Sequence, residues 1–292
     1  MPNANLMRRW AAVAVATVAA MVLTGCMFTA GKFTSTLDLR RDSTFSFAYN
    51  GEIYLLGLSK LAEMERGSRT PEEFAASLCY VENADEPKER ECTKNELAQQ
   101  RTEWDELQKL AAENKQREGM AMRTMLGGID PGDPKAADEI TARLRKQAGW
   151  RTVEYKGDGL FVVDFAIAGR LDHDFTFPTI ERMPQANAFV VLARRNDGTV
   201  RIDAPGFSAG TGGGSFRTMM GLAAMGAGDD SKDSEVPKLP ELAGTFTLTT
   251  DAEILANNTE DGPSAVTTGK QLKWTISVRT EQAPTALVKL GL

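Results

Sequence analysis

The centre of this chain contains the stretch LFVVDFAI, residues 160–167, which is apolar at almost every position. Alternate side chains of a strand point to opposite faces, so both faces of this strand would be apolar. Such a strand belongs inside a sheet rather than at its edge. The glycine-rich turn GDG at 157–159 precedes it, and an alternating segment at 171–177 follows and ends at Pro178. These residues predict a sheet built around 160–167.

The same alternation of apolar and polar residues predicts further strands on both sides of this stretch. Turn sequences separate neighbouring segments and indicate hairpins, with RDS at 41–43 in one hairpin and NDG at 196–198 in another. In the last predicted strand, Trp274 and Ile276 face the core. The additional predicted strands are residues 33–39, 45–49, 152–155, 189–193, 200–204, 245–248, 253–256 and 271–278.

Helices are predicted in the block 70–149 from their capping sequences. TPEE at 70–73 and TKNE at 93–96 each place a glutamate three residues after a threonine, as a capping box requires. The first predicts a short helix to about Leu78, and the second predicts a long charged helix that the glycines at 127–128 break. A third helix begins near Pro134 and ends at Gly149.

Residues 53–64 leave two alternatives open. The spacing of Ile53, Leu56, Leu61 and Met64 is nearer to that of a helix, whereas Tyr54 and the residue after it extend the preceding sheet. We predict a helix here.

A change of composition marks residues 206–240, which are rich in glycine and methionine early and in acidic and small residues late. Such a segment buries too little apolar area to order itself, so it predicts a flexible linker. The strands in 241–292 then close the domain that occupies 33–205. The chain is therefore predicted to be α+β, with an antiparallel or mixed sheet, a helical block inserted at 70–149, and this linker before the closing strands.

The N-terminus has the order of a secretory signal: two arginines at 8–9, an apolar run at 10–23, and small residues before Cys26. The run is too short to span a membrane. LTGC at 23–26 resembles a bacterial lipobox, which implies cleavage before Cys26, a diacylglycerol thioether on its sulfur, and acylation (palmitate) of the new amino group. Residues 1–25 are then a signal peptide and 26–32 a lipidated tether. An ordinary secretory peptide and an uncleaved N-terminal helix are the alternatives.

Location and partners follow from this assignment. The residue after Cys26 is not the aspartate that retains many lipoproteins in the inner membrane, so we predict attachment to the outer membrane, with the cell membrane as the alternative, facing the periplasm. The formal net charge is −6 and no block of basic residues stands out. Nucleic acid is therefore not expected as a partner.

The cysteines and the single histidine decide between a disulfide and a metal site. With Cys26 acylated, Cys79 and Cys92 remain as a pair in an oxidising compartment, which predicts a disulfide. A metal site would need more ligands than His173, the only histidine, provides. We expect no metal and no cofactor.

Two patterns suggest catalysis. GFSAG at 206–210 fits the pattern of a nucleophile elbow around Ser208, but the histidine that deprotonates such a serine follows it in the chain, and His173 precedes it. Within DHD at 172–174, an extended strand would direct His173 away from both aspartates and into the protein. We therefore expect no catalytic residue and no enzyme, with a serine hydrolase using Ser208 as the alternative.

Methionines form two groups that are candidates for a ligand surface, because thioether side chains adapt to irregular apolar ligands. Packing in a core is the other explanation for both groups. The candidates are Met120, Met122, Met125, Met219, Met220 and Met225.

The arrangement is similar to that of the LppM-domain envelope lipoproteins. The resemblance rests on the lipobox, a first strand pair at 36–47, a helical middle, the asparagine-bearing turn ANN at 256–258 and the tryptophan strand LKWTI at 272–276. It implies a membrane-anchored, non-enzymatic envelope protein that handles lipid. The predicted function is thus the binding of an envelope lipid or protein, and the alternative is a structural subunit of an envelope assembly.

Overall fold

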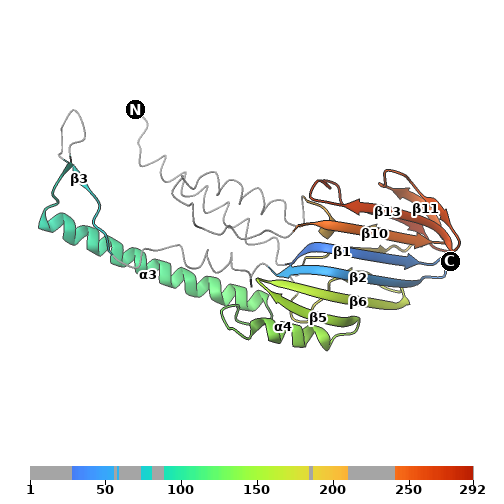
Figure 1. Cartoon of the computed structure of the whole chain (residues 1–292), viewed down its shortest axis with the longest axis horizontal. Coiled ribbons are helices and arrows are strands. Elements are labelled where there is room, and N and C mark those ends of the chain that lie inside the picture. Colours follow the sequence, from blue (N-terminus) through green and yellow to red (C-terminus); the bar gives the residue numbers. More distant parts are fainter. Residues whose placement is uncertain are drawn as a thin grey trace.

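The fold is α+β, as predicted: a β-sandwich from which one long helix projects (Figure 1). The computed structural model describes residues 28–55, 58, 74–80, 89–183, 187–209 and 241–291. Predictions that concern Cys26, the helix start at 70–73, the linker residues 210–240 and the methionines Met219, Met220 and Met225 lie outside these residues.

The larger sheet has seven strands and is mixed. Its strands pair in antiparallel fashion except for β1 and β10, which are parallel, with Lys32 opposite Ala243. This pairing places the first strand of the fold beside the first of the closing strands. In spatial order the strands are β12 (Ser264–Val266), β13 (Gly269–Ile276), β10 (Ala243–Thr250), β1 (Phe28–Leu39), β2 (Thr44–Leu55), β6 (Leu160–Arg170) and β5 (Trp150–Gly157).

The smaller sheet has five strands, all antiparallel, and it covers one face of the larger sheet. The chain passes from the larger sheet to the smaller one between β10 and β11, through residues 251–252. In spatial order the strands are β11 (Glu253–Asn257), β14 (Thr285–Lys289), β9 (Thr199–Asp203), β8 (Val190–Arg194) and β7 (Phe175–Phe177). The short helix η2 (Pro205–Phe207) follows β9.

Aromatic side chains fill the space between the sheets. Phe33 of the larger sheet stacks on Phe207 with ring centroids 4.2 Å apart, and Tyr49 lies 5.1 Å from Phe177 of the smaller sheet. The hydroxyl of Tyr49 donates to the carbonyl of Glu52, and complete burial raises the pKa of Tyr49 well above its ordinary value. The inward orientation predicted for Trp274 and Ile276 is confirmed, since both are buried.

The two described α-helices have different positions. The helix α4 (Ala136–Arg145) packs its buried residues Ile140 and Leu144 beside β5 at the edge of the sandwich. The helix α3 (Lys94–Met125) projects from one end of the sandwich. The predicted break follows its C-cap, where the glycines at 127–128 both have positive φ. At 1.5 Å per residue, α3 is about 48 Å long.

A two-stranded ladder lies at the outer end of α3 (Figure 1). It consists of β3 (Cys79–Tyr80) and β4 (Glu89–Arg90), which immediately precede the helix in the chain. We call α3, β3, β4 and residues 74–78 together the arm.

Two predicted boundaries in the first half of the chain are wrong. Residues 53–55, predicted as the start of a helix, continue β2, because Ile53 and Leu55 are buried and pair with residues of β1. Residues 74–78, predicted as the end of a short helix, are not helical, because the disulfide and the β3–β4 ladder hold the following residues in an extended form.

The tether and the linker also begin or end at other residues than predicted. Residues 28–32 are not a tether but the first part of β1, where Phe28 and Ala30 are buried. Residues 206–209 are not linker, because Phe207 is fully buried in the aromatic core and Ser208 is buried beside it. Both errors arise from apolar residues in segments whose composition is otherwise that of a loop.

Candidate functional site

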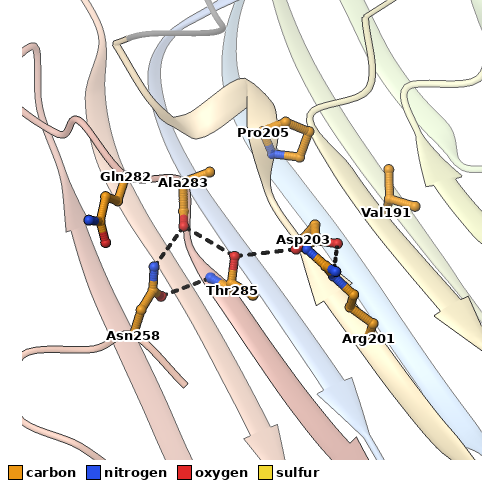
Figure 2. Close-up of a pocket in the computed structure, with 8 residues that line it drawn as sticks. All are labelled: Val191, Arg201, Asp203, Pro205, Asn258, Gln282, Ala283 and Thr285. Carbon is orange, nitrogen blue, oxygen red and sulfur yellow. Dashed lines mark hydrogen bonds and ion pairs between the residues drawn. The ribbon is translucent and has the colours of Figure 1, made fainter. Parts of the chain in front are cut away.

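An open groove of about 610 Å³ lies on the outer face of the smaller sheet (Figure 2). Its charged residues are Arg201 and Asp203 of β9, whose Nε and Oδ2 atoms are 2.6 Å apart. The hydroxyl of Thr285 donates to the other carboxylate oxygen of Asp203 at 3.2 Å, and the carboxylate raises the pKa of Arg201. The groove is lined by Val191, Arg201, Asp203, Pro205, Asn258, Gln282, Ala283 and Thr285.

Asn258 connects this groove to the larger sheet. Its side-chain oxygen accepts hydrogen bonds from the indole Nε1 of Trp274 at 2.9 Å and from the backbone N of Thr285 at 2.8 Å. Its side-chain nitrogen donates to the carbonyl of Ala283. The asparagine turn and the tryptophan strand noted in the sequence therefore meet, and their polar atoms join β13 of one sheet to β14 of the other.

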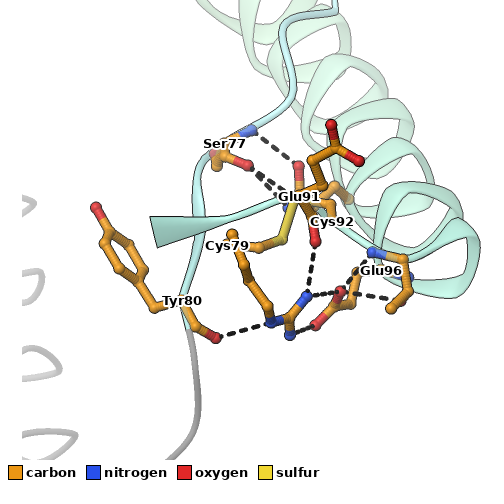
Figure 3. The surroundings of a disulfide bond; sticks show 9 residues. Ser77, Cys79, Tyr80, Glu91, Cys92 and Glu96 are labelled. Carbon is orange, nitrogen blue, oxygen red and sulfur yellow. Dashed lines mark hydrogen bonds and ion pairs between the residues drawn. A yellow bond between two sulfur atoms is a disulfide. The ribbon is translucent and has the colours of Figure 1, made fainter. Parts of the chain in front are cut away.

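The outer end of the arm contains the predicted Cys79–Cys92 disulfide, which is confirmed, with the two Cα atoms 5.3 Å apart (Figure 3). Gln100 of α3 supports it, since its side-chain oxygen accepts from the backbone N of Ser77 at 2.8 Å. The disulfide thus joins β3 to the residue just before the N-cap of α3, and Gln100 joins the segment before β3 to the helix itself.

An ion pair and a capping box stabilise the same end of the arm. The guanidinium of Arg90 donates two hydrogen bonds to the carboxylate of Glu96, at 2.8 and 2.6 Å. Glu96 also accepts from the backbone N of Thr93 and completes the predicted capping box. Arg90 first, and then Thr93, lower the pKa of Glu96 to about 2.

Along the arm, apolar side chains are exposed among charged ones. Leu107 and Leu110 expose more than half of their surface, and Arg101 lies over the rings of Phe74 and Trp104, 5.1 and 5.6 Å from their centroids. Basic and acidic residues occur in equal numbers in α3. The arm is therefore neutral overall and carries small apolar areas.

Met120 and Met122, two of the methionines predicted as a ligand surface, are separated from each other. Met120 is 60% exposed, whereas Met122 packs against the hydrophobic core. The two thioethers therefore do not form one surface, because residues two positions apart on a helix point in different directions. The side chain of Met125 lies outside the described part of the structure.

Ser208 and His173 lie at opposite ends of the smaller sheet. Ser208 follows β9 beyond Asp203, which pairs with Val191 near the start of β8. His173 precedes Asp174, whose carboxylate accepts from the backbone N of Arg194 at the other end of β8. The hydroxyl of the buried Ser208 donates to the carbonyl of Pro205 at 3.2 Å. The Ser–His pair that the hydrolase alternative requires is not formed.

The predicted orientation of His173 is wrong. Its side chain is 86% exposed, because β7 begins only at Phe175 and residues 172–173 form a bend instead of a strand. The imidazole hydrogen-bonds to the neighbouring carboxylate of Asp172 and lowers the pKa of that group. Asp174 accepts from the backbone N of Arg194 and helps to hold the bend in place.

The described residues provide neither a cluster of metal ligands nor a membrane-spanning helix. Within the described ranges, no group of three or more histidine, cysteine, aspartate or glutamate side chains is placed to hold a metal ion. Neither α3 nor α4 contains an apolar stretch long enough to span a bilayer.

Comparison with known proteins yields one loose likeness. No family model matches the chain, and no curated protein matches it. The NMR structure of the folded domain of LppM from Mycobacterium tuberculosis matches with 10% identity over 92% of this chain and 93% of that one, at a TM-score of 0.30. The predicted resemblance to the LppM-domain family is thus found only as a loose structural similarity.

Proposed function

We propose that this protein is a lipoprotein held to the periplasmic face of a bacterial membrane through Cys26, and that it binds an envelope lipid or protein without catalysis. The observation that carries the proposal is the lipobox LTGC at 23–26, which ends two residues before the fold begins at Phe28. A protein whose body starts directly after such a signal is exported and then retained by its lipid.

The Cys79–Cys92 disulfide supports the same location. Disulfides form and persist in oxidising compartments such as the periplasm and are rare in the cytosol. At the outer end of the arm, the bond holds β3 beside the start of α3, together with the Arg90–Glu96 ion pair.

The anchor is tested by replacing its sulfur. We expect Cys26→Ser to move the protein from the membrane fraction to the soluble periplasmic fraction and to abolish labelling with a palmitate analogue. Cys79→Ser is the matched control, since it removes another cysteine and leaves the anchor intact. Membrane attachment of Cys26→Ser at the level of the control would contradict the proposal.

Binding of an envelope component is tested on the folded chain without its lipid. Native mass spectrometry of the Cys26→Ser protein, purified from the periplasm, should show a co-purified lipid or a bound envelope protein. The exposed Leu107 and Leu110 are the first residues to test, and Leu107→Gln should reduce the bound fraction without unfolding the protein. A spectrum that contains only the bare chain under gentle ionisation would count against this part of the proposal.

A further inference from the structure

The end of the sandwich from which the arm projects is also the end at which the fold begins. Phe28 at the start of β1 pairs with Leu55 at the end of β2, and Tyr54 pairs with Leu160 at the start of β6, so these residues share one end of the larger sheet. Figure 1 shows that α3 reaches the sandwich at this end and extends away from it. The sandwich and the arm therefore extend in opposite directions from one junction.

Very little chain separates this junction from Cys26. Two residues after Cys26 the chain is already in β1, and two peptide units span at most about 7 Å. Phe28 and Ala30 are 2% and 0% exposed, so this part of β1 does not lengthen the connection without losing buried contacts. An acyl chain on Cys26 would thus hold the junction itself at the membrane surface.

In the described part of the chain, neither the arm nor the sandwich presents a surface suited to the interior of the bilayer. The arm carries exposed basic and acidic residues along its whole length, and charged side chains are costly in the hydrocarbon region. The sandwich presents polar strand faces and loops, which lipid tails also exclude. An upright sandwich would direct the arm, about 48 Å long, into the membrane.

We infer that the lipidated protein lies with its long axis along the membrane, so that the arm and the sandwich both rest beside the lipid headgroups. The inference rests on the proposed lipid anchor. The two halves have similar reach, because the twelve residues of β1 span about 40 Å and α3 about 48 Å. The partner of this surface is the headgroup layer of the bilayer itself.

Energy transfer to the membrane tests this orientation in the full, lipidated chain. Lys94→Cys at the outer end of the arm and Asn196→Cys at the far end of the sandwich each provide one free thiol for a donor dye, since Cys26 is acylated and Cys79 and Cys92 are joined. The vesicles contain phosphatidylethanolamine and phosphatidylglycerol with a headgroup acceptor. We expect transfer from the two sites to agree within about twofold, because both ends lie at a similar height. Strong transfer from one site and none from the other would overturn the inference.

A longer connection provides the control. A flexible Gly/Ser insertion of about 20 residues between Met27 and Phe28 should reduce transfer from both sites, because the junction is then free to leave the surface. Unchanged transfer would show that the short connection does not set the orientation, and would overturn the inference. Flotation of the vesicles is measured separately. A protein that fails to float with the vesicles contradicts the lipid anchor, whereas one that floats but shows unequal transfer from the two sites contradicts only the orientation.

Discussion

The sandwich and the arm of this protein are stabilised in different ways. In the sandwich, rings from strands far apart in the sequence contact one another, as Phe33 contacts Phe207 and Tyr49 contacts Phe177. In the arm, the contacts are local: a disulfide with a sequence separation of 13, a capping box, and the Arg90–Glu96 ion pair. Loss of one arm contact should therefore open the arm and leave the sandwich folded.

The largest effect is expected from the aromatic core. Phe207→Ala removes a fully buried ring and should lower the free energy of unfolding by about 3–5 kcal/mol, since the cavity only partly collapses. Urea denaturation of the periplasmic Cys26→Ser protein measures it. Leu107→Ala on the exposed side of the arm is the control and should change stability by less than about 0.5 kcal/mol. Equal effects of the two variants would remove the distinction between sandwich and arm.

The second-largest effect on stability is expected from loss of the disulfide. Cys79→Ser should destabilise the outer end of the arm by about 3 kcal/mol, because the closed loop restricts the unfolded segment. Hydrogen exchange should accelerate in β3, β4 and the first turns of α3, while the amides of β1 and β10 stay protected. If protection falls equally in the sandwich strands, the arm and the sandwich unfold as one unit.

A smaller effect is expected where the two sheets are joined. Asn258→Ala leaves the indole N–H of Trp274 and the backbone N–H of Thr285 without their acceptor, which should cost about 1–3 kcal/mol. Trp274→Phe in the same background shows whether the indole accounts for the loss. Additive effects of the two substitutions in a double-mutant cycle would mean that the hydrogen bond contributes little.

The smallest effect depends on pH and concerns only the arm. The pKa of Glu96 is lowered from 4.5 to about 2 by Arg90 and Thr93. The stability that the ionised carboxylate gives to the start of α3 is therefore complete above pH 4.5 and is lost as the pH falls toward 2. Hydrogen exchange at the start of α3 should accelerate over this range. Glu96→Gln should abolish the change, and Glu103→Gln, about two turns further along the exposed helix, should retain it. If hydrogen exchange at the start of α3 still accelerates at low pH in Glu96→Gln, another titrating group is responsible.

Local features of this fold were predictable from the sequence, whereas pairings between distant segments were not. Alternation predicted the strands near 33–39 and 160–167, and the capping box at 93–96 predicted the start of α3, because these depend on neighbouring residues. The parallel pairing of β1 with β10 has no local signal. The strand β14 was not predicted, since its sequence TALVK contains three consecutive apolar residues and shows no alternation.

In the candidate site, too, some features were predictable from the sequence and others were not. The disulfide was predicted from the count and location of the cysteines, and this count needs no structure. The groove was not predicted, because its residues come from β8, β9, β14 and the turns beside them. A partial signal existed in Asn258 and Trp274, whose side chains proved to be bonded to each other.

The pairing of β1 with β10 has a consequence for the order of events during synthesis. Strand β1 is made first, but its partner at Ala243–Thr250 leaves the ribosome only near the end of translation. At about 5–20 residues per second, β1 waits roughly 10–40 s for this partner. During that interval one edge of β1, with its unpaired backbone N–H and C=O groups, is open to other extended chains. Protection of this edge while the chain is incomplete is therefore a requirement for a correct yield of the folded protein.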